Sequence, residues 1–128
     1  HQLQWTCAGH PLPLLQNMDT NEITILGHED QIGLPLAVMQ NWSYECISAH
    51  IPPHSRVLLY TDGLDEAFPP EGDALLDQFG ITGIIDALKE SINMPLDEAM
   101  NLLFFKSTEI TAGAGRHDDT SVMMIERK

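Results

Sequence analysis

The sequence predicts an α+β fold, with short antiparallel strands first, helices next and a single strand at the end. In the first half of the chain, apolar or alternating segments are separated by connections too short for helical crossovers. The second half contains two segments with apolar residues at helical spacing. A final strand-like segment follows these helices, an order unlike alternating βαβ units.

The predicted strands follow one another through the first 60 residues. Residues 2–7 and the apolar return at 12–15 are separated by Gly and Pro, which predicts a hairpin between them. Residues 22–26 are rich in β-branched side chains, and residues 42–50 begin with alternation, so each is expected to be a strand. Residues 57–60 form an apolar run typical of a buried strand, expected to pair antiparallel with 42–50.

Two or three helices are predicted after these strands. Residues 74–79 suggest a short helix, and residues 81–92 carry apolar side chains three and four positions apart. Pro95 suits the first position of a third helix that continues to about Thr108. A glycine-rich link then leads to the last predicted strand, residues 121–125.

Composition limits the classes of partner. The chain has 128 residues, and its 19 acidic and 6 basic side chains give a net charge of −13. This charge argues against nucleic acid and an anionic membrane surface as partners, because both attract clustered Lys and Arg. The sequence has no apolar run long enough to span a membrane and no recognisable signal peptide, so we expect a cytoplasmic location. Cys7 and Cys46 lack zinc-site spacing and are expected to be buried free thiols.

Acidic side chains stand at the ends of two predicted strands. Asp62 follows the apolar run directly, Glu66 comes four residues later, and Asp118 and Asp119 precede the last strand. If the two strands are neighbours, Asp62 and one of the later pair converge, and carboxylate oxygens favour Mg²⁺ or Mn²⁺. The alternative is that these acids cap turns and point into solvent, and the residues alone leave both interpretations open. His117, beside Asp118, is the one histidine that the pattern singles out.

Several short motifs occur together in the order and spacing of one family. They are Ala8-Gly9-His10-Pro11, Gly33-Leu34-Pro35-Leu36, the segment from Leu58 through Thr61-Asp62-Gly63 to Ala67, and Asp118-Asp119-Thr120-Ser121. With them the chain resembles the C-terminal portion of a PPM/PP2C-type serine/threonine phosphatase domain of the bacterial SpoIIE/RsbU group. The resemblance covers nearly all of residues 1–128, which would form part of a single domain. It implies a PP2C-like sandwich of two antiparallel β-sheets flanked by α-helices, with its N-terminal part missing.

The resemblance also implies a site that holds two Mn²⁺ or Mg²⁺ ions. Asp62 and Asp118 match the family's catalytic metal ligands, and Glu66 matches an acidic position that assists a further metal in some relatives. Asp119 is expected to be a supporting residue, and Gly63 to permit a close approach of the backbone.

The function implied by the resemblance is hydrolysis of phosphoserine or phosphothreonine on a protein. Water would attack the phosphorus in line, without a covalent phosphoenzyme. The implied substrate is a phosphorylated anti-sigma-factor antagonist of the STAS type, and an N-terminal sensor or receiver domain would supply regulation. A non-catalytic phosphatase-like interaction module is the alternative, and exposed sheet edges would allow a homodimer.

One departure from the family pattern concerns the first metal motif. An Asp followed by a Gly-His-Gly-like turn should precede the Ala8-Gly9-His10-Pro11 motif, and the chain does not contain it. Asp62 and Asp118 would therefore form half a site, and the chain by itself is expected to have little phosphatase activity. An upstream Asp with such a turn would favour the enzyme, and its loss would favour the interaction module.

Overall fold

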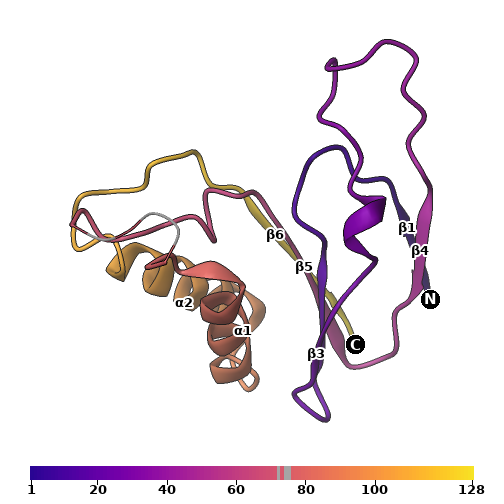
Figure 1. Cartoon of the computed structure of the whole chain (residues 1–128). Helices are drawn as coiled ribbons and strands as arrows, with labels where there is room; N and C mark the ends of the chain where they lie inside the picture. Colours follow the sequence, from indigo (N-terminus) through magenta and orange to yellow (C-terminus); the bar gives the residue numbers. More distant parts are fainter. Residues whose placement is uncertain (72, 74–75) are drawn as a thin grey trace. The chain divides into compact units, whose positions relative to one another are not determined.

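The computed structural model describes residues 1–71, 73 and 76–128, and in them the predicted α+β fold is confirmed. Strands dominate the first half, two helices follow, and a strand ends the chain (Figure 1). In order, the elements are β1 (Gln2–Trp5), β2 (Leu14–Asn17), β3 (Ile23–Ile25), the 3₁₀-helix η1 (Glu29–Gln31), β4 (Ile47–His50), β5 (Ser55–Tyr60), α1 (Gly80–Glu90), α2 (Leu96–Glu109) and β6 (Val122–Arg127).

The chain divides into two compact units. The first contains residues 1–59 and 125–128, and the second contains residues 60–124. The assignment of residues 1–128 to a single domain stays a prediction.

The strands form two antiparallel sheets. β1 pairs with β4, which places Gln2 opposite His50 and Trp5 opposite Ile47. The other sheet has the order β3-β2-β5-β6. In it, Leu14 of β2 lies opposite both Ile25 of β3 and Leu58 of β5.

The predicted hairpin between residues 2–7 and 12–15 is wrong. β1 pairs with β4, far along the chain, and β2 pairs with β3 and β5. Burial explains the choice, because Leu3 and Trp5 pack against the buried cluster of Leu26, Ile51 and Val57. A short connection shows only that two strands could pair, and apolar burial decides which partner each strand takes.

The predicted strand at residues 42–50 is shorter than expected and has a different neighbour. Only Ile47–His50 is a strand, and β5 lies between β2 and β6, not beside β4. Residues 42–46 have no regular structure, although their sequence begins with alternation. Trp42, which carries this pattern, is 42% exposed, so the alternation does not mark a buried face.

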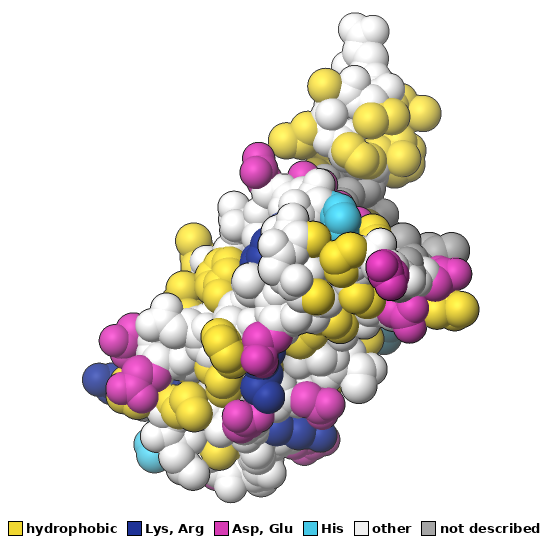
Figure 2. All heavy atoms as spheres, turned by 90° about the vertical axis from the view of Figure 1, so that its left-hand side faces the viewer, with side chains coloured by type: hydrophobic (Ala, Val, Ile, Leu, Met, Phe, Trp, Pro, Cys, Tyr) yellow, Lys and Arg dark blue, Asp and Glu magenta, His cyan; other side chains and the backbone are white. Residues whose placement is uncertain are grey.

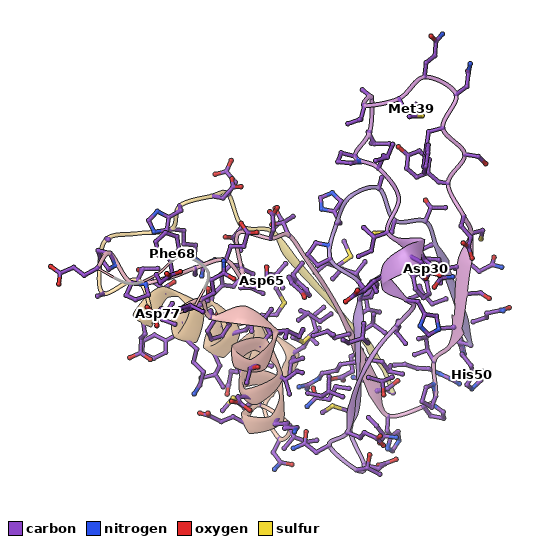
Figure 3. All side chains as sticks on the ribbon, in the orientation of Figure 1. Asp30, Met39, His50, Asp65, Phe68 and Asp77 are labelled. Carbon is purple, nitrogen blue, oxygen red and sulfur yellow. The ribbon has the colours of Figure 1, made fainter. Side chains whose placement is uncertain are left out.

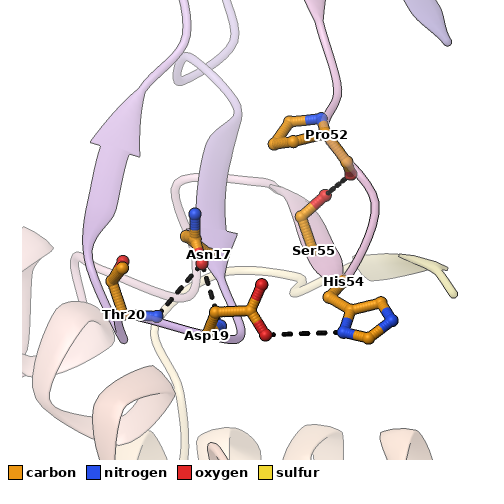
Figure 4. Close-up of polar contacts among 6 residues, drawn as sticks. All are labelled: Asn17, Asp19, Thr20, Pro52, His54 and Ser55. Carbon is orange, nitrogen blue, oxygen red and sulfur yellow. Dashed lines mark hydrogen bonds and ion pairs between the residues drawn. The ribbon is translucent and has the colours of Figure 1, made fainter.

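A side-chain-capped turn joins β2 to β3. Asn17 Oδ1 accepts hydrogen bonds from the backbone N–H groups two and three residues later, at 2.8 Å and 3.1 Å (Figure 4). Asp19 in this turn forms an exposed ion pair with His54, 3.4 Å between Oδ1 and Nδ1. Ser55, at the start of β5, donates to the Pro52 carbonyl oxygen at 2.6 Å. The turn and the start of β5 are thus fixed locally.

β5 is the buried strand that its apolar sequence predicts. Val57 and Leu58 are 3% and 1% exposed. Arg56, 4% exposed, places its Nε 2.8 Å from a carboxylate oxygen of Glu126 on β6. This charge-assisted contact satisfies an ionised group that would be costly to bury alone.

The two helices are amphipathic, as their spacing predicts. α1 buries Ile84, Ala87 and Leu88, and α2 buries Ala99, Leu103 and Ser107. Pro95 differs from expectation by one residue, because its extended ψ of 156° makes it the N-cap of α2. For the predicted helix at 74–79, residues 74 and 75 lie outside the described part, and residues 76–79 are not helical.

A loop with exposed apolar side chains follows η1. Leu36, Val38 and Met39 are 73%, 63% and 55% exposed, and residues 34–44 carry no charged side chain. Figure 2 shows hydrophobic side chains gathered at the top of the view, and Figure 3 labels Met39 on this loop. At its base, Gly9 leaves room for Pro35, because a Cβ on Gly9 would lie 2.7 Å from Pro35 Cγ.

The two cysteine thiols differ in exposure. Their expected burial is right for Cys7 and wrong for Cys46, which is exposed outside any strand.

Within the described residues, no helix has the length and apolar character needed to cross a membrane.

We expect Leu58→Ala to lower the free energy of unfolding by about 2–5 kcal/mol, because it leaves a cavity in the most buried strand. Chemical denaturation monitored by circular dichroism measures this change. Leu36→Ala is the matched control at a 73% exposed position and should change stability by less than about 0.5 kcal/mol. Equal effects of the two substitutions would contradict the burial assigned to β5.

Candidate metal centre

The residues after β5 form a tight turn that presents two carboxylates. Leu64 donates its backbone N–H to the Thr61 carbonyl oxygen at 3.0 Å, and Glu66 donates to that of Asp62 at 2.9 Å. The second bond has helical i to i+4 spacing and closes one turn of backbone between the two acidic residues. Both side chains are exposed and free to face a ligand.

Helix α2 and the start of α1 hold this turn in place. Ser107 Oγ of α2 donates to the Leu64 carbonyl oxygen at 2.9 Å, and both residues are fully buried. The backbone N–H groups of Phe79 and Gly80 donate to the carbonyls of Ala67 and Asp65 at 2.7 Å and 2.8 Å. The acidic turn is therefore a fixed element.

Hydrogen bonds join the end of β5 to the start of β6. Thr61 N–H donates to the Ser121 carbonyl oxygen at 3.1 Å, and Ser121 N–H donates to Thr61 Oγ1 at 2.9 Å. Thr61 Oγ1 in turn lies 3.3 Å from the Asp119 carbonyl oxygen and donates to it. The two acid-bearing strands are thus neighbours, which is the condition under which the sequence predicts that their acids converge.

Gly63 allows the two acidic segments to approach closely. A Cβ at this position would lie 2.5 Å from the Asp119 carbonyl oxygen, 2.8 Å from Thr120 Oγ1 and 3.0 Å from the Asp118 carbonyl oxygen. Two of these atoms belong to the backbone and cannot easily move aside. Glycine, which has no Cβ, permits this approach of the two backbones.

The segment that carries Asp118 and Asp119 is attached to α2 through Arg116. Arg116 Nη2 donates to the Phe104 carbonyl oxygen and to Thr108 Oγ1, each at 3.0 Å. Its guanidinium carbon lies 4.9 Å from the centre of the Phe104 ring, and partial burial lowers the pKa of Arg116. Asp118 Oδ1 accepts a hydrogen bond from the backbone N–H of Asp119 at 2.7 Å.

Two hollows border this acidic segment. One of about 240 Å³ has both Glu66 and Asp118 in its wall, together with Gly63, Ala67, Phe68, Gln78 and His117. The other, about 620 Å³ and open, is lined by Phe104, Thr108 and residues 116–120. Glu66 and Asp118 are therefore brought to one hollow, Asp119 lines the other, and Asp62 lines neither of them.

Negative charge accumulates in the turn after β5. Burial raises the pKa of Asp65, the charges of Glu66 and Asp62 raise it further, and backbone hydrogen bonds oppose the change. Asp65 Oδ1 is buried, and it has no hydrogen-bond partner in the described part of the chain. Figure 3 shows Asp65 and Phe68 on this acidic segment. A bound cation would relieve the mutual repulsion of these carboxylates.

The carboxylate oxygens of the acidic segments suit a hard divalent cation, but the described residues supply too few of them to hold a metal alone. Exposed carboxylates, such as those of Asp62, Glu66 and Asp118, suit Mg²⁺ or Mn²⁺. The described residues contain no group of three or more His, Cys, Asp or Glu that could hold a metal alone. The metal-binding roles of these three residues therefore stay predictions. The predicted site requires further ligands.

Residues that connect the two acidic segments were missed by sequence reasoning. Thr61 joins β5 to β6, Ser107 holds the turn, and Phe68 stacks on His117. For Ser107, the one available signal in the sequence was its position at helical spacing from the apolar residues of α2. The other two contacts join positions about 50 to 60 residues apart, and local patterns say nothing about them.

Comparisons with known proteins give a family and a fold. The family described as Stage II sporulation protein E (SpoIIE) matches residues 1–128. The chain is similar to the SiaA-PP2C domain of Pseudomonas aeruginosa, with 20% identity and a TM-score of 0.73 over 99% of this chain and 47% of that one. No curated protein matches it in sequence.

Two further solved structures share the fold. The RsbU and RsbW domains of Rv1364c from Mycobacterium tuberculosis match with 20% identity and a TM-score of 0.73, over 99% of this chain and 33% of that one. The phosphatase domain of SpoIIE from Bacillus subtilis matches with 12% identity and a TM-score of 0.63, over 98% of this chain and 50% of that one. The chain thus spans between a third and a half of the length of these three structures.

Thr61→Val should lower the free energy of unfolding by about 1–2 kcal/mol, because it removes the hydroxyl that bonds both Ser121 and Asp119. Thr61→Ser keeps the hydroxyl and serves as the matched control, with a smaller loss. Denaturant unfolding measures both changes. A serine variant as unstable as the valine variant would show that the hydroxyl does not join the strands.

Tyr60 should make the fold sensitive to alkaline pH. Burial, together with the charge of Asp65, raises the pKa of Tyr60 from 10.0 to about 12 in the folded chain. Because the unfolded chain loses this proton first, stability should fall as the pH rises from 10 to 12, by at most about 2–3 kcal/mol. Thermal unfolding over this range should show a smaller fall for Tyr60→Phe. An unchanged slope would contradict the burial of a neutral phenol.

Proposed function

Because the chain belongs to the SpoIIE family, we propose that it forms part of a metal-dependent protein serine/threonine phosphatase. The observation that carries this proposal is the junction of β5 with β6. Thr61 and Ser121 join the two strands where each meets its acidic segment. The two acidic segments, which come from distant parts of the sequence, are thereby brought to one end of the sheet.

In this proposal Asp62 and Asp118 are metal ligands, and Glu66 contributes to the same site. The hollow shared by Glu66 and Asp118 supports the grouping of these two residues. Asp119 and Gly63 act as supporting residues, one adjacent to a ligand and the other permitting the close approach of the backbones. The cations of choice are Mn²⁺ or Mg²⁺, because the donors are carboxylate oxygens.

The reaction is hydrolysis of a phosphoserine or phosphothreonine monoester. Bound divalent ions would supply an activated water molecule and neutralise charge on the phosphoryl group. The chain's own contribution is to orient the carboxylates: Ser107 fixes the turn, and Arg116 ties the Asp118 segment to α2. Such fixed orientation before binding is what a metal centre requires of its protein.

The substrate class and partners are proposed from the family. We assign a phosphorylated STAS-type antagonist as substrate, a sensor or receiver domain as the regulator, and the cytoplasm as the location. One matched structure joins an RsbU domain to an RsbW domain, and another joins a SpoIIE phosphatase domain to a fragment of its regulatory domain. These are properties of those proteins, and they support a signalling role for this chain.

The half-site predicted from the sequence remains part of the proposal. The chain matches 47% of the Pseudomonas domain and 50% of the Bacillus domain, so the remaining ligands are expected in the rest of a complete domain. A non-catalytic interaction module remains the second candidate. It would bind a phosphoprotein in the presence of Mn²⁺ without releasing phosphate.

Asp62→Asn in the complete domain should weaken Mn²⁺ binding by about tenfold or more and lower the turnover of a phosphoserine peptide by about 100-fold. Calorimetric Mn²⁺ titration and phosphate release measure the two effects. Asp30→Asn, at an exposed carboxylate on η1, is the matched control and should change neither.

Several outcomes would contradict these assignments. Equal Mn²⁺ affinity and turnover in the wild type and Asp62→Asn would remove Asp62 from the site. Full turnover by the 128-residue chain alone would refute the half-site. Mn²⁺-dependent binding of the phosphopeptide without phosphate release by the complete domain would favour the interaction module.

A further inference from the structure

An aromatic stack connects the two acidic segments. The rings of Phe68 and His117 lie with their centres 4.0 Å apart and their planes inclined by 14°. Phe68 comes two residues after Glu66, and His117 directly precedes Asp118. The contact therefore joins the backbone that carries one candidate ligand to the backbone that carries another.

The stack forms part of the wall of the hollow that these two acids share. Phe68 and His117 line the 240 Å³ hollow together with Glu66 and Asp118. Within the described residues, the imidazole of His117 makes no hydrogen bond or ion pair, so its contact with Phe68 is its one specific interaction there. His117 is exposed, and solvation alone would leave its ring free to turn away.

The hydrogen bonds on either side of Asp118 do not by themselves fix the direction in which its side chain points. On one side, Arg116 is tied to Phe104 and Thr108 of α2. On the other, Thr61 holds Asp119 and Ser121. Within the described residues Asp118 has only local hydrogen bonds: its Oδ1 accepts from the backbone N–H of Asp119, and its carbonyl oxygen accepts from Thr120 Oγ1. Besides the close backbone approach at Gly63, the stack at His117 is a side-chain contact that joins this stretch to the segment of Glu66.

We propose that the Phe68–His117 stack is a positioning element that holds Asp118 toward Glu66 and thereby sets the affinity of the site for Mn²⁺. This inference rests on the proposed function, because it takes Asp118 and Glu66 as ligands of one metal centre. In this proposal Phe68 and His117 are positioning residues and not metal ligands. They act by limiting the conformations of the ligand-bearing backbone before binding, which lowers the entropy cost of assembling the site.

If the positioning depends on the stacking of two rings, substitutions of Phe68 and His117 should change Mn²⁺ affinity in a specific pattern. Leucine at either position removes one ring and leaves an apolar side chain of similar size. Phe68→Leu and His117→Leu should each weaken Mn²⁺ binding by about two- to tenfold, the range expected for one aromatic pair. The double variant should be no weaker than the weaker single variant, because either change alone abolishes the stack. His117→Phe restores two stacked rings and should stay within about twofold of the wild type.

The experiment measures the Mn²⁺ dissociation constant of the complete phosphatase domain by calorimetry, together with the thermal midpoint in the absence of metal. Phe105→Leu, at a 58% exposed position on α2, and His50→Leu, at an exposed position on β4, are the matched controls. Neither control should change Mn²⁺ affinity. The metal-free midpoints of all variants should remain close to that of the wild type, which separates positioning from loss of folding.

The outcomes distinguish this inference from the proposed function. Asp62→Asn is measured in parallel, and unchanged Mn²⁺ affinity in that variant would overturn the proposed function and this inference with it. If Asp62→Asn binds weakly while both leucine variants bind as the wild type does, the function stands and the positioning role is refuted. Additive losses in the double variant, or a His117→Phe variant as weak as His117→Leu, would also refute stacking as the cause. A fall in the metal-free midpoint of both His117→Leu and His117→Phe would assign the residue to folding.

Discussion

The short hydrogen-bonded contact between Thr61 and Ser121 is the constraint on which the candidate site depends. It fixes the end of β5 against the start of β6, and each of these strand ends continues directly into an acidic segment. Gly63 then allows the backbone of one segment to lie against that of the other. If the pairing of the strands shifted by one residue, the two acidic segments would no longer lie opposite each other as they do here.

Helix α2 is the second element that both acidic segments share. Its buried Ser107 donates to the turn after β5, and the carbonyl oxygen of Phe104 receives the guanidinium of Arg116. Each contact satisfies a polar group while fixing a loop. A helix whose apolar face packs against α1 thus also holds both acidic segments in place.

The acidic turn after β5 gathers like charges. The carboxylates of Asp62, Asp65 and Glu66 lie within one turn, and their mutual repulsion adds to burial in raising the pKa of Asp65. A folded arrangement of like charges is costly unless a proton or a cation compensates for it. The described part of the chain contains no group of three or more potential ligands that could hold that cation alone, which agrees with a chain covering half or less of the three structures compared above.

The sequence by itself determined the α+β class, the two amphipathic helices, the buried character of β5 and the positions of the acids at strand ends. These follow from local periodicity and from motifs that are continuous in the chain. Only the tertiary structure decided that β1 pairs with β4, that residues 42–46 are irregular, and that Phe68 stacks on His117. Each of these depends on which distant apolar or aromatic surface a segment can reach. Such burial is settled between residues far apart in the sequence, where local patterns carry no information.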